Sequence, residues 1–351
     1  MRLTSLGGAL SAALTLLAAP LAAQGGQSYT LPGDRVTIYD LAGQITIEAG
    51  TGSSVVVQVT RLGSDASRLQ VETGPLRERQ TLRVIFPGDR IVMPQRDWNG
   101  NTEMWVRDDG TFGDEYRGRG EGRRVTIGTR GDGLEAQANL SIAVPPGKSL
   151  SVHLGVGRIE ASNVNGSLNL DGASADITAH GIHGSLNMDT GSGNVTATDV
   201  EGGLHIDTGS GDVRVTGAHS GGISIDTGSG DVTGSTIQGT SINIDTGSGN
   251  IDLSGTQSSE ITLETGSGDV RLTLQTDIET LDVETGSGNV TLTVPEAFGA
   301  TVDLETSSGN IVSDVPLQVT RRSEDRLTGR IGDGRGRMSV ETGSGDVTIR
   351  R

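Results

Sequence analysis

Apolar and polar residues alternate along most of this chain, and the alternation is regular enough to predict short strands. Leu204 and Ile206 flank a polar residue, and Val213 and Val215 do the same a few positions later. A period of two residues is typical of a strand that buries one face. Between the two pairs lies the glycine-rich segment 208–212. We expect a sharp turn there, with Gly209 and Gly211 taking positive φ.

The alternation is itself repeated. Eight copies of a seven-residue unit read DTGSGNV, DTGSGDV, DTGSGDV, DTGSGNI, ETGSGDV, ETGSGNV, ETSSGNI and ETGSGDV, and they begin at residues 189, 207, 226, 245, 264, 284, 305 and 341. Two degenerate copies, HLGVGRI from His153 and DGASADI from Asp171, extend the series upstream. A fixed short period indicates stacked coils. The sequence therefore predicts an all-β fold, a single-stranded parallel β-solenoid (β-helix or β-roll-like) with about 18–20 residues per coil. Whether Val200 and Ile237 mark a third face stays open.

The pattern changes along the chain and divides it into four parts. Residues 1–23 read as a signal peptide, 24–92 as an N-terminal region of β strands that cap the solenoid, 93–124 as a polar Arg/Gly-rich insertion loop, and 125–351 as the solenoid. At the far end we expect Arg350 and Arg351 to protect the last strand with charge.

Composition supports this division. The chain has 55 Gly, 2% aromatic residues and no Cys, which suits a narrow aliphatic core and excludes a disulfide framework. A formal net charge of −17 argues against a nucleic-acid partner. Arg2, an apolar run and small residues up to Ala23 predict cleavage near Ala23 and an extracytoplasmic location, in the periplasm, at the cell surface or secreted. No later apolar run is long enough for a transmembrane segment.

Several stretches resemble the bacterial DUF4097 family, which carries the label adhesin. They are DRVTIYDLAGQITIEAG, LSIAVPPGKSLSVHLGVGRIEASNVNGSLNL, the DTGSGDV units and the closing IGDGRGRMSVETGSGDVTIR. The resemblance covers roughly residues 28–351, and the insertion is its main departure. It implies an extracytoplasmic β-helical protein and brings no catalytic residues.

The repeated carboxylates are the main candidates for chemistry. Asp-Thr-Gly-Ser is also the signature of aspartic proteases, but copies one coil apart form a surface column without a cleft. Two such columns flank a glycine-rich turn, as in calcium-binding β-rolls, although the spacing Gly-x-Gly-Asp is one residue short. The calcium candidates are Asp207, Asp212, Asp226, Asp231, Asp245, Glu264 and Asp269. The alternative is turn chemistry with solvated carboxylates. His180 and His183 form an HxxH pair with no evident third ligand for zinc.

These observations favour a non-enzymatic adhesin or envelope-binding scaffold that acts through repeated weak contacts. Thr208, Ser210 and Asp212 with their equivalents are expected to line an exposed edge that supplies such contacts. Its partner would be a protein or glycan of the cell envelope or surface, and calcium is the one candidate cofactor. A more specific partner would bind the insertion, at Trp98, Trp105, Arg117 and Arg119. A purely structural envelope protein and, less favoured, a β-helix carbohydrate-active enzyme are the alternatives.

Overall fold

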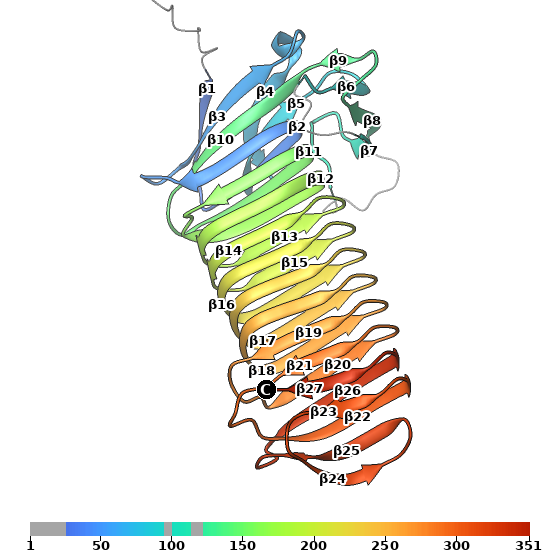
Figure 1. Ribbon diagram of the computed structural model, residues 1–351. Coiled ribbons are helices and arrows are strands. Elements are labelled where there is room, and N and C mark those ends of the chain that lie inside the picture. Colours follow the sequence, from blue (N-terminus) through green and yellow to red (C-terminus); the bar gives the residue numbers. More distant parts are fainter. Residues whose placement is uncertain (1–25, 95–99, 114–121) are drawn as a thin grey trace, which may run out of the picture.

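A computed structural model describes residues 26–94, 100–113 and 122–351. These residues form a rod of stacked β coils with further strands at both ends (Figure 1). The expected signal peptide and the candidates Trp98, Arg117 and Arg119 lie outside the described residues. No helix in the described part of the chain has the length and apolar character needed to cross a bilayer.

The predicted solenoid is confirmed by the register of its strands. Leu204 lies beside Ile223, and Ile206 lies beside Ile225, one coil further on. The inward-facing aliphatic side chains are almost completely buried, so successive coils share one continuous core. The strands are β11 (Lys148–Ser162), β12 (Gly166–His183), β13 (Leu186–Thr190), β14 (Val195–Glu201), β15 (Leu204–Thr208), β16 (Val213–Thr227), β17 (Val232–Thr246), β18 (Ile251–Thr265), β19 (Val270–Leu274), β20 (Thr280–Thr285), β21 (Val290–Thr293), β22 (Ala300–Ser308), β23 (Ile311–Ser313), β26 (Gly336–Ser344) and β27 (Val347–Arg350).

A third short face completes the middle coils. Val200 pairs with Ala218, which pairs with Ile237, and all three side chains are fully buried. The residue just before this face has left-handed backbone in three successive coils, with φ of 51° at Asp199, 66° at Gly217 and 54° at Thr236. One residue with positive φ therefore forms the corner that precedes each of these third faces.

The N-terminal strands cap the rod. Strand β2 forms the first rung, because Val36 lies beside Leu150 and Ile45 beside Ile159. Strands β5 and β4 extend one face beyond it, and β10, β3 and β1 extend the other. The bounds are β1 (Gln27–Leu31), β2 (Arg35–Ala49), β3 (Val55–Leu62), a 3₁₀ helix (Ala66–Arg68), β4 (Gln70–Leu76), β5 (Arg79–Ile85) and β10 (Gln137–Val144).

Part of the described insertion is strand and not loop. It contributes to a four-stranded sheet of β7 (Asn101–Val106), β8 (Arg123–Gly128), β6 (Arg90–Val92) and β9 (Leu134–Glu135), in that order. The prediction rested on its polar composition, but Val106 and Phe112 are buried. Thr102 Oγ1 donates to Ser174 Oγ at 2.8 Å, which joins the sheet to the turn edge of the first coils.

The C-terminal end departs from chain order. Strand β26 lies between β20 and β22, and β27 lies between β21 and β23. The last copy of the repeat, at Glu341, therefore sits between the copies at Glu284 and Glu305. The expectation that Arg350 and Arg351 guard the open end is wrong, because β27 is paired on both sides. The end is covered instead by the antiparallel hairpin of β24 (Leu317–Arg322) and β25 (Arg326–Ile331).

Candidate functional site

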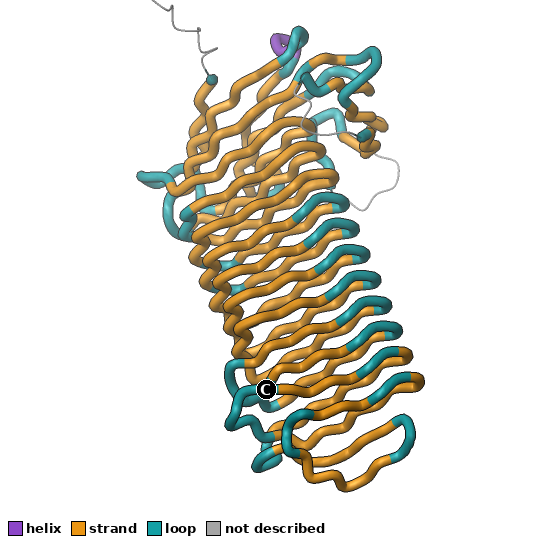
Figure 2. Tube along the Cα trace, viewed as in Figure 1, coloured by secondary structure: helices purple, strands orange, loops and turns teal. Residues whose placement is uncertain are grey.

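The turns of the repeat stack along one edge of the rod, here called the turn edge (Figure 2). Its glycines are needed for close approach between coils. A Cβ built on Gly209 would lie 2.6 Å from the carbonyl oxygen of Gly191, and one built on Gly230 would lie 2.1 Å from that of Gly211. The expected positive φ is confirmed at Gly211, where it is 159° and close to extended backbone, and is wrong at Gly209, which has none. The repeat keeps glycine because adjacent turns touch backbone to backbone.

The threonine of each repeat faces inward. Thr208 is fully buried, so the prediction that it lines an exposed edge is wrong. Thr190 Oγ1 donates to the carbonyl of Ala175 at 2.9 Å, and Thr265 Oγ1 donates to that of Gly249 at the same distance. A hydroxyl is kept there because it satisfies a carbonyl in the turn of the preceding coil.

The Asp or Asn that closes each turn forms a ladder along the rod. The backbone N–H of Asp231 donates to Asp212 Oδ1 at 3.1 Å, and that of Asn250 donates to Asp231 Oδ1 at 2.8 Å. The same bond continues through Asp269, where hydrogen bonding from the backbone N–H of Asn289 is the largest influence and lowers the pKa of the carboxyl. The calcium candidates Asp212, Asp231 and Asp269 thus each use one carboxylate oxygen to join coils.

The first carboxylate of each repeat forms a second line, here called the acidic column. Its members are in register from coil to coil: Asp171, Asp189, Asp207, Asp226, Asp245, Glu264, Glu284, Glu341 and Glu305. In the described structure the candidates Asp207, Asp226, Asp245 and Glu264 are exposed and form no ion pair. The described residues contain no group of three or more His, Cys, Asp or Glu side chains placed to hold a metal ion.

Both ends of the acidic column are closed by other side chains. At the C-terminal end Arg326, from the capping hairpin, pairs with Asp303 at 2.5 Å and with Glu305 at 3.3 Å. At the other end His153 Nδ1 lies 2.6 Å from Asp171 Oδ2. The ring of His153 stacks on Tyr39 with centroids 4.6 Å apart, and Phe112 of the insertion packs edge-on against both rings. The insertion therefore covers the head of the column.

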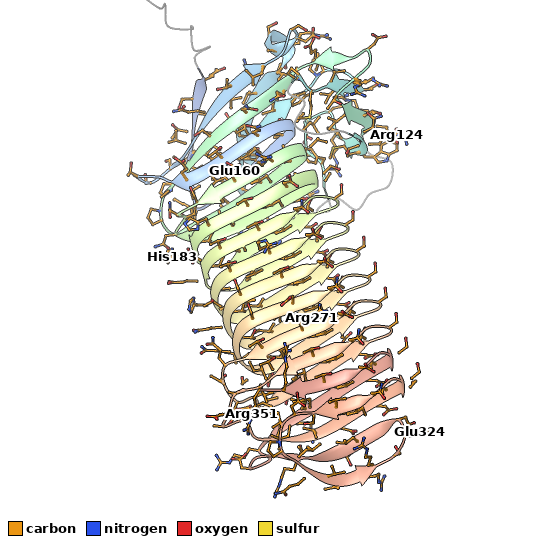
Figure 3. The ribbon with its side chains drawn as sticks, viewed as in Figure 1. Arg124, Glu160, His183, Arg271, Glu324 and Arg351 are labelled. Atoms are coloured by element: carbon orange, nitrogen blue, oxygen red, sulfur yellow. The ribbon has the colours of Figure 1, made fainter. Side chains whose placement is uncertain are left out.

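His183 lies at the opposite edge of the rod from the turns (Figure 3), and each histidine of the HxxH pair lies near a carboxylate one coil away. His180 Nδ1 lies 3.5 Å from Asp199 Oδ2, and His183 Nε2 lies 3.6 Å from Glu201 Oε2. These side chains are more than half exposed, so they are solvated surface pairs.

Among the insertion candidates, Trp105 is described and is 61% exposed. It lies on β7 opposite Arg124, which forms an ion pair with Glu103 (Figure 3). A large apolar side chain held in the open by a small sheet suits a contact with another molecule.

A cavity of about 270 Å³ lies where the turn edge of the first coils meets Met93 and Gln137. Its other walls include Arg158, Ser174, Asp176 and Ser192, with close backbone at Gly43, Gly157 and Gly193. Sequence reasoning missed these residues. The signal was the arginine of HLGVGRI, which stands where the regular copies have Asp or Asn.

Comparison with known proteins adds the following. The model of the family described as Toastrack DUF4097 matches residues 134–350. No curated protein matches the chain. A solved structure of a "putative cell adhesion protein" from Clostridium sporogenes ATCC 15579 aligns over 92% of this chain and 97% of that one, with 9% identity and a TM-score of 0.20. Agreement that low carries no argument about fold or function.

Proposed function

The chain belongs to the Toastrack DUF4097 family, and we propose that it acts outside the cytoplasm as a non-enzymatic adhesin or envelope-binding scaffold. The rod would hold a protein or glycan of the cell envelope through weak contacts repeated from coil to coil. The predicted signal peptide supports the location.

The observation that carries this proposal is the in-register repetition of exposed groups. Asp207 and Asp226 are partners in adjacent coils, and Asp226 and Asp245 are partners in the next pair. A partner with its own repeat can touch several coils at once, and linked weak contacts add to a useful avidity. The threonine hydroxyls are excluded from this surface, so the exposed carboxylates and the serines of the turns would supply the contacts.

The cavity gives no support to a β-helix hydrolase. Glycoside hydrolysis uses two carboxyl groups that flank the bond to be cleaved. Among the described residues that line the cavity, Asp176 is the single carboxylate, and its side chain accepts the backbone N–H of Asn194 at 2.9 Å. This arrangement suits holding a molecule rather than cleaving it.

Removing whole coils tests the proposal. Deleting residues 232–250 joins Asp231 to Ile251, the register partner of Val232, so the remaining coils can pair as before. Deleting 213–250 removes two coils in the same way. We expect retention on bacterial envelope fractions to fall several-fold with each coil removed, because avidity depends on the number of simultaneous contacts.

Thermal unfolding of both deletions serves as the folding control. If both bind as the full-length protein does, repeated contacts are not the mechanism. Specific binding through the insertion would then be favoured, and it would be lost in Trp105→Ala; the candidates Trp98, Arg117 and Arg119 belong to the same proposal. If no form binds, the purely structural role is favoured.

A further inference from the structure

We infer that the cavity at the head of the turn edge binds a small hydroxylated acid of the sugar-acid class, as a free molecule or as one unit of a polymer. The inference does not depend on the proposed repeated contacts. It starts from the place where the repeat is broken.

The break lies at the position of the Asp or Asn that closes each turn and forms the hydrogen-bond ladder. Arg158 is the register partner of Asp176 on one side and of Gln44 on the other. The following coils carry Asn194, Asp212 and Asp231 at this position, joined by backbone-to-side-chain bonds. A cation therefore replaces an acid or amide at the coil where the cavity lies. Arg158 has one ion-pair contact in the described structure, a distant 3.8 Å to Glu160, and its side chain is 47% exposed.

The rest of the wall offers hydroxyl partners. Ser174 Oγ is nearly buried and lies 3.1 Å from Ser192 Oγ, and Thr102 Oγ1 donates to it at 2.8 Å. Asp176 Oδ1 accepts the N–H of Asn194, which leaves its second oxygen for a ligand hydroxyl. Met93 adds an apolar surface on the side of the insertion.

This set selects a class of ligand. A guanidinium binds a carboxylate through two parallel hydrogen bonds, and a carboxylate and serines bind hydroxyls. At about 270 Å³ the cavity is slightly smaller than the roughly 300–1,000 Å³ typical of sites for drug-sized ligands. A monosaccharide acid fits both its size and its polar groups. Further along the turn edge, the equivalent serines and ladder residues face solvent. At the first coils the insertion contributes Met93 to the wall and so encloses a cavity.

The test is titration calorimetry of the full chain with D-glucuronate and D-galacturonate, and with D-glucose and D-galactose as neutral counterparts. We expect binding of at least one acid and at least about tenfold weaker binding of its neutral counterpart, because the sugar lacks the charged partner of Arg158. Arg158→Gln should weaken binding of the acid at least about tenfold. Arg214→Gln, which changes an exposed arginine on β16, should leave the affinity for the acid unchanged.

Ser192→Phe provides a second variant, because Ser192 is exposed at the cavity and a phenyl ring there would occupy it. Binding should be lost while the melting temperature stays that of the parent. A hexamer of the same acid separates the sources: tighter binding than the monomer indicates a polymer end, and equal binding indicates the free acid.

Equal binding of acid and neutral sugar, no effect of Arg158→Gln, or no binding at millimolar ligand would overturn the inference. The deletion of residues 232–250 leaves every residue of the cavity in place. It should bind the acid unchanged even where its retention on envelope fractions falls, so the two proposals can fail separately.

Discussion

At the scale of single residues, Asp40 is the least expected feature. It occupies the inward position that threonine holds in regular coils, since it lies in register with Leu154, Gly172 and Thr190. Its carboxyl is fully buried, and in the described structure its Oδ2 atom has no hydrogen-bond partner. Burial raises the pKa of Asp40 well above its usual value of 3.8, and the backbone N–H groups of Ala42 and Leu41 offset this in part. Burial therefore favours the neutral form of this acid inside the cap.

The raised pKa fixes the sign of a pH effect. The folded state holds the proton more tightly than the unfolded state, so the stabilisation is fully present below pH 3.8 and is lost as the pH rises through the folded pKa. We expect Asp40→Asn, which is neutral throughout, to raise the melting temperature at pH 7 and to have a smaller effect near pH 4. Thermal unfolding across this range measures it.

The control is Asp34→Asn. Hydrogen bonding and charge attraction from Lys148 lower the pKa of Asp34, so this contribution is present above pH 3.8 and is lost as the pH falls through the folded pKa. Its substitution should lower the melting temperature at pH 7. Parallel pH profiles for the two variants would contradict the assignment.

Thr236 gives a second residue-scale prediction. Its φ of 54° puts a β-branched side chain in the left-handed region, where the neighbouring coils carry Gly217 and Gly255. Thr236→Gly should stabilise the protein by about 1 kcal/mol, because the steric cost of left-handed backbone is removed. Thr233→Gly, the same change within β17, should destabilise it by about 0.5–1 kcal/mol. Urea unfolding of both variants measures these changes in the free energy of unfolding. A loss of stability in Thr236→Gly would show that the threonine side chain stabilises the fold by more than its left-handed backbone costs.

At the scale of the turn edge, spacing between coils governs which residues are allowed. Gly230→Ala should destabilise the protein by about 1–3 kcal/mol, since its Cβ would lie 2.1 Å from the Gly211 carbonyl oxygen, which belongs to the backbone of the preceding coil and cannot turn aside. A Cβ added at Gly221 would have no atom within 4 Å, so Gly221→Ala should be neutral or stabilise the protein by up to about 1 kcal/mol. Denaturant midpoints compare them, and equal effects would mean that adjacent coils can separate at little cost.

The acidic column leads to a prediction about ions. Carboxylates in neighbouring coils stand ~4.8 Å apart, and each adjacent pair costs about 1 kcal/mol in water. Screening by any cation should therefore raise the melting temperature, and calcium and magnesium should do so equally. Asp226→Asn, which removes one charge from the middle of the column, should reduce the salt dependence. A rise with calcium that magnesium does not reproduce would instead make the sequence-based calcium candidates true ligands.

The turn edge also shows how far the sequence could be interpreted. Eight near-identical copies were enough to predict the coil and its register, because aliphatic alternation allows one inward face. The same alternation, continued from Leu204 and Ile206, also places Thr208 inward and Asp207 outward; the prediction of an exposed Thr208 was wrong because it followed the polar character of the residue and not its position in the strand. The cavity was not predicted, because Arg158 and Met93 line it from segments far apart in the chain, and the break in the repeat at Arg158 does not show which segment closes the cavity.

At the scale of the whole molecule, the order of the coils was equally hidden. The copies at Glu305 and Glu341 differ by little, so either satisfies the pattern for a place beside the copy at Glu284. The chain instead builds the outer coil and its capping hairpin, then returns to fill the gap with β26 and β27. The last two strands of the sequence, β26 and β27, therefore connect the rod to its outer coil and C-terminal cap.

This arrangement predicts the effect of a C-terminal truncation. A protein ending at Ile331 leaves β20 and β22 each without the partner that β26 supplies, and unpaired strand edges associate. We expect oligomers in size-exclusion chromatography with light scattering, and a lower melting temperature. A synthetic peptide of residues 332–351 should restore the monomer, because its backbone can pair on both sides. The same peptide with Gly343→Ala and Gly345→Ala should not, since each Cβ would lie within 2.4 Å of a carbonyl oxygen in the preceding coil. A truncated protein that stays monomeric with an unchanged melting temperature would show that the copy at Glu305 can pair directly with the copy at Glu284, and that the inserted strands are dispensable.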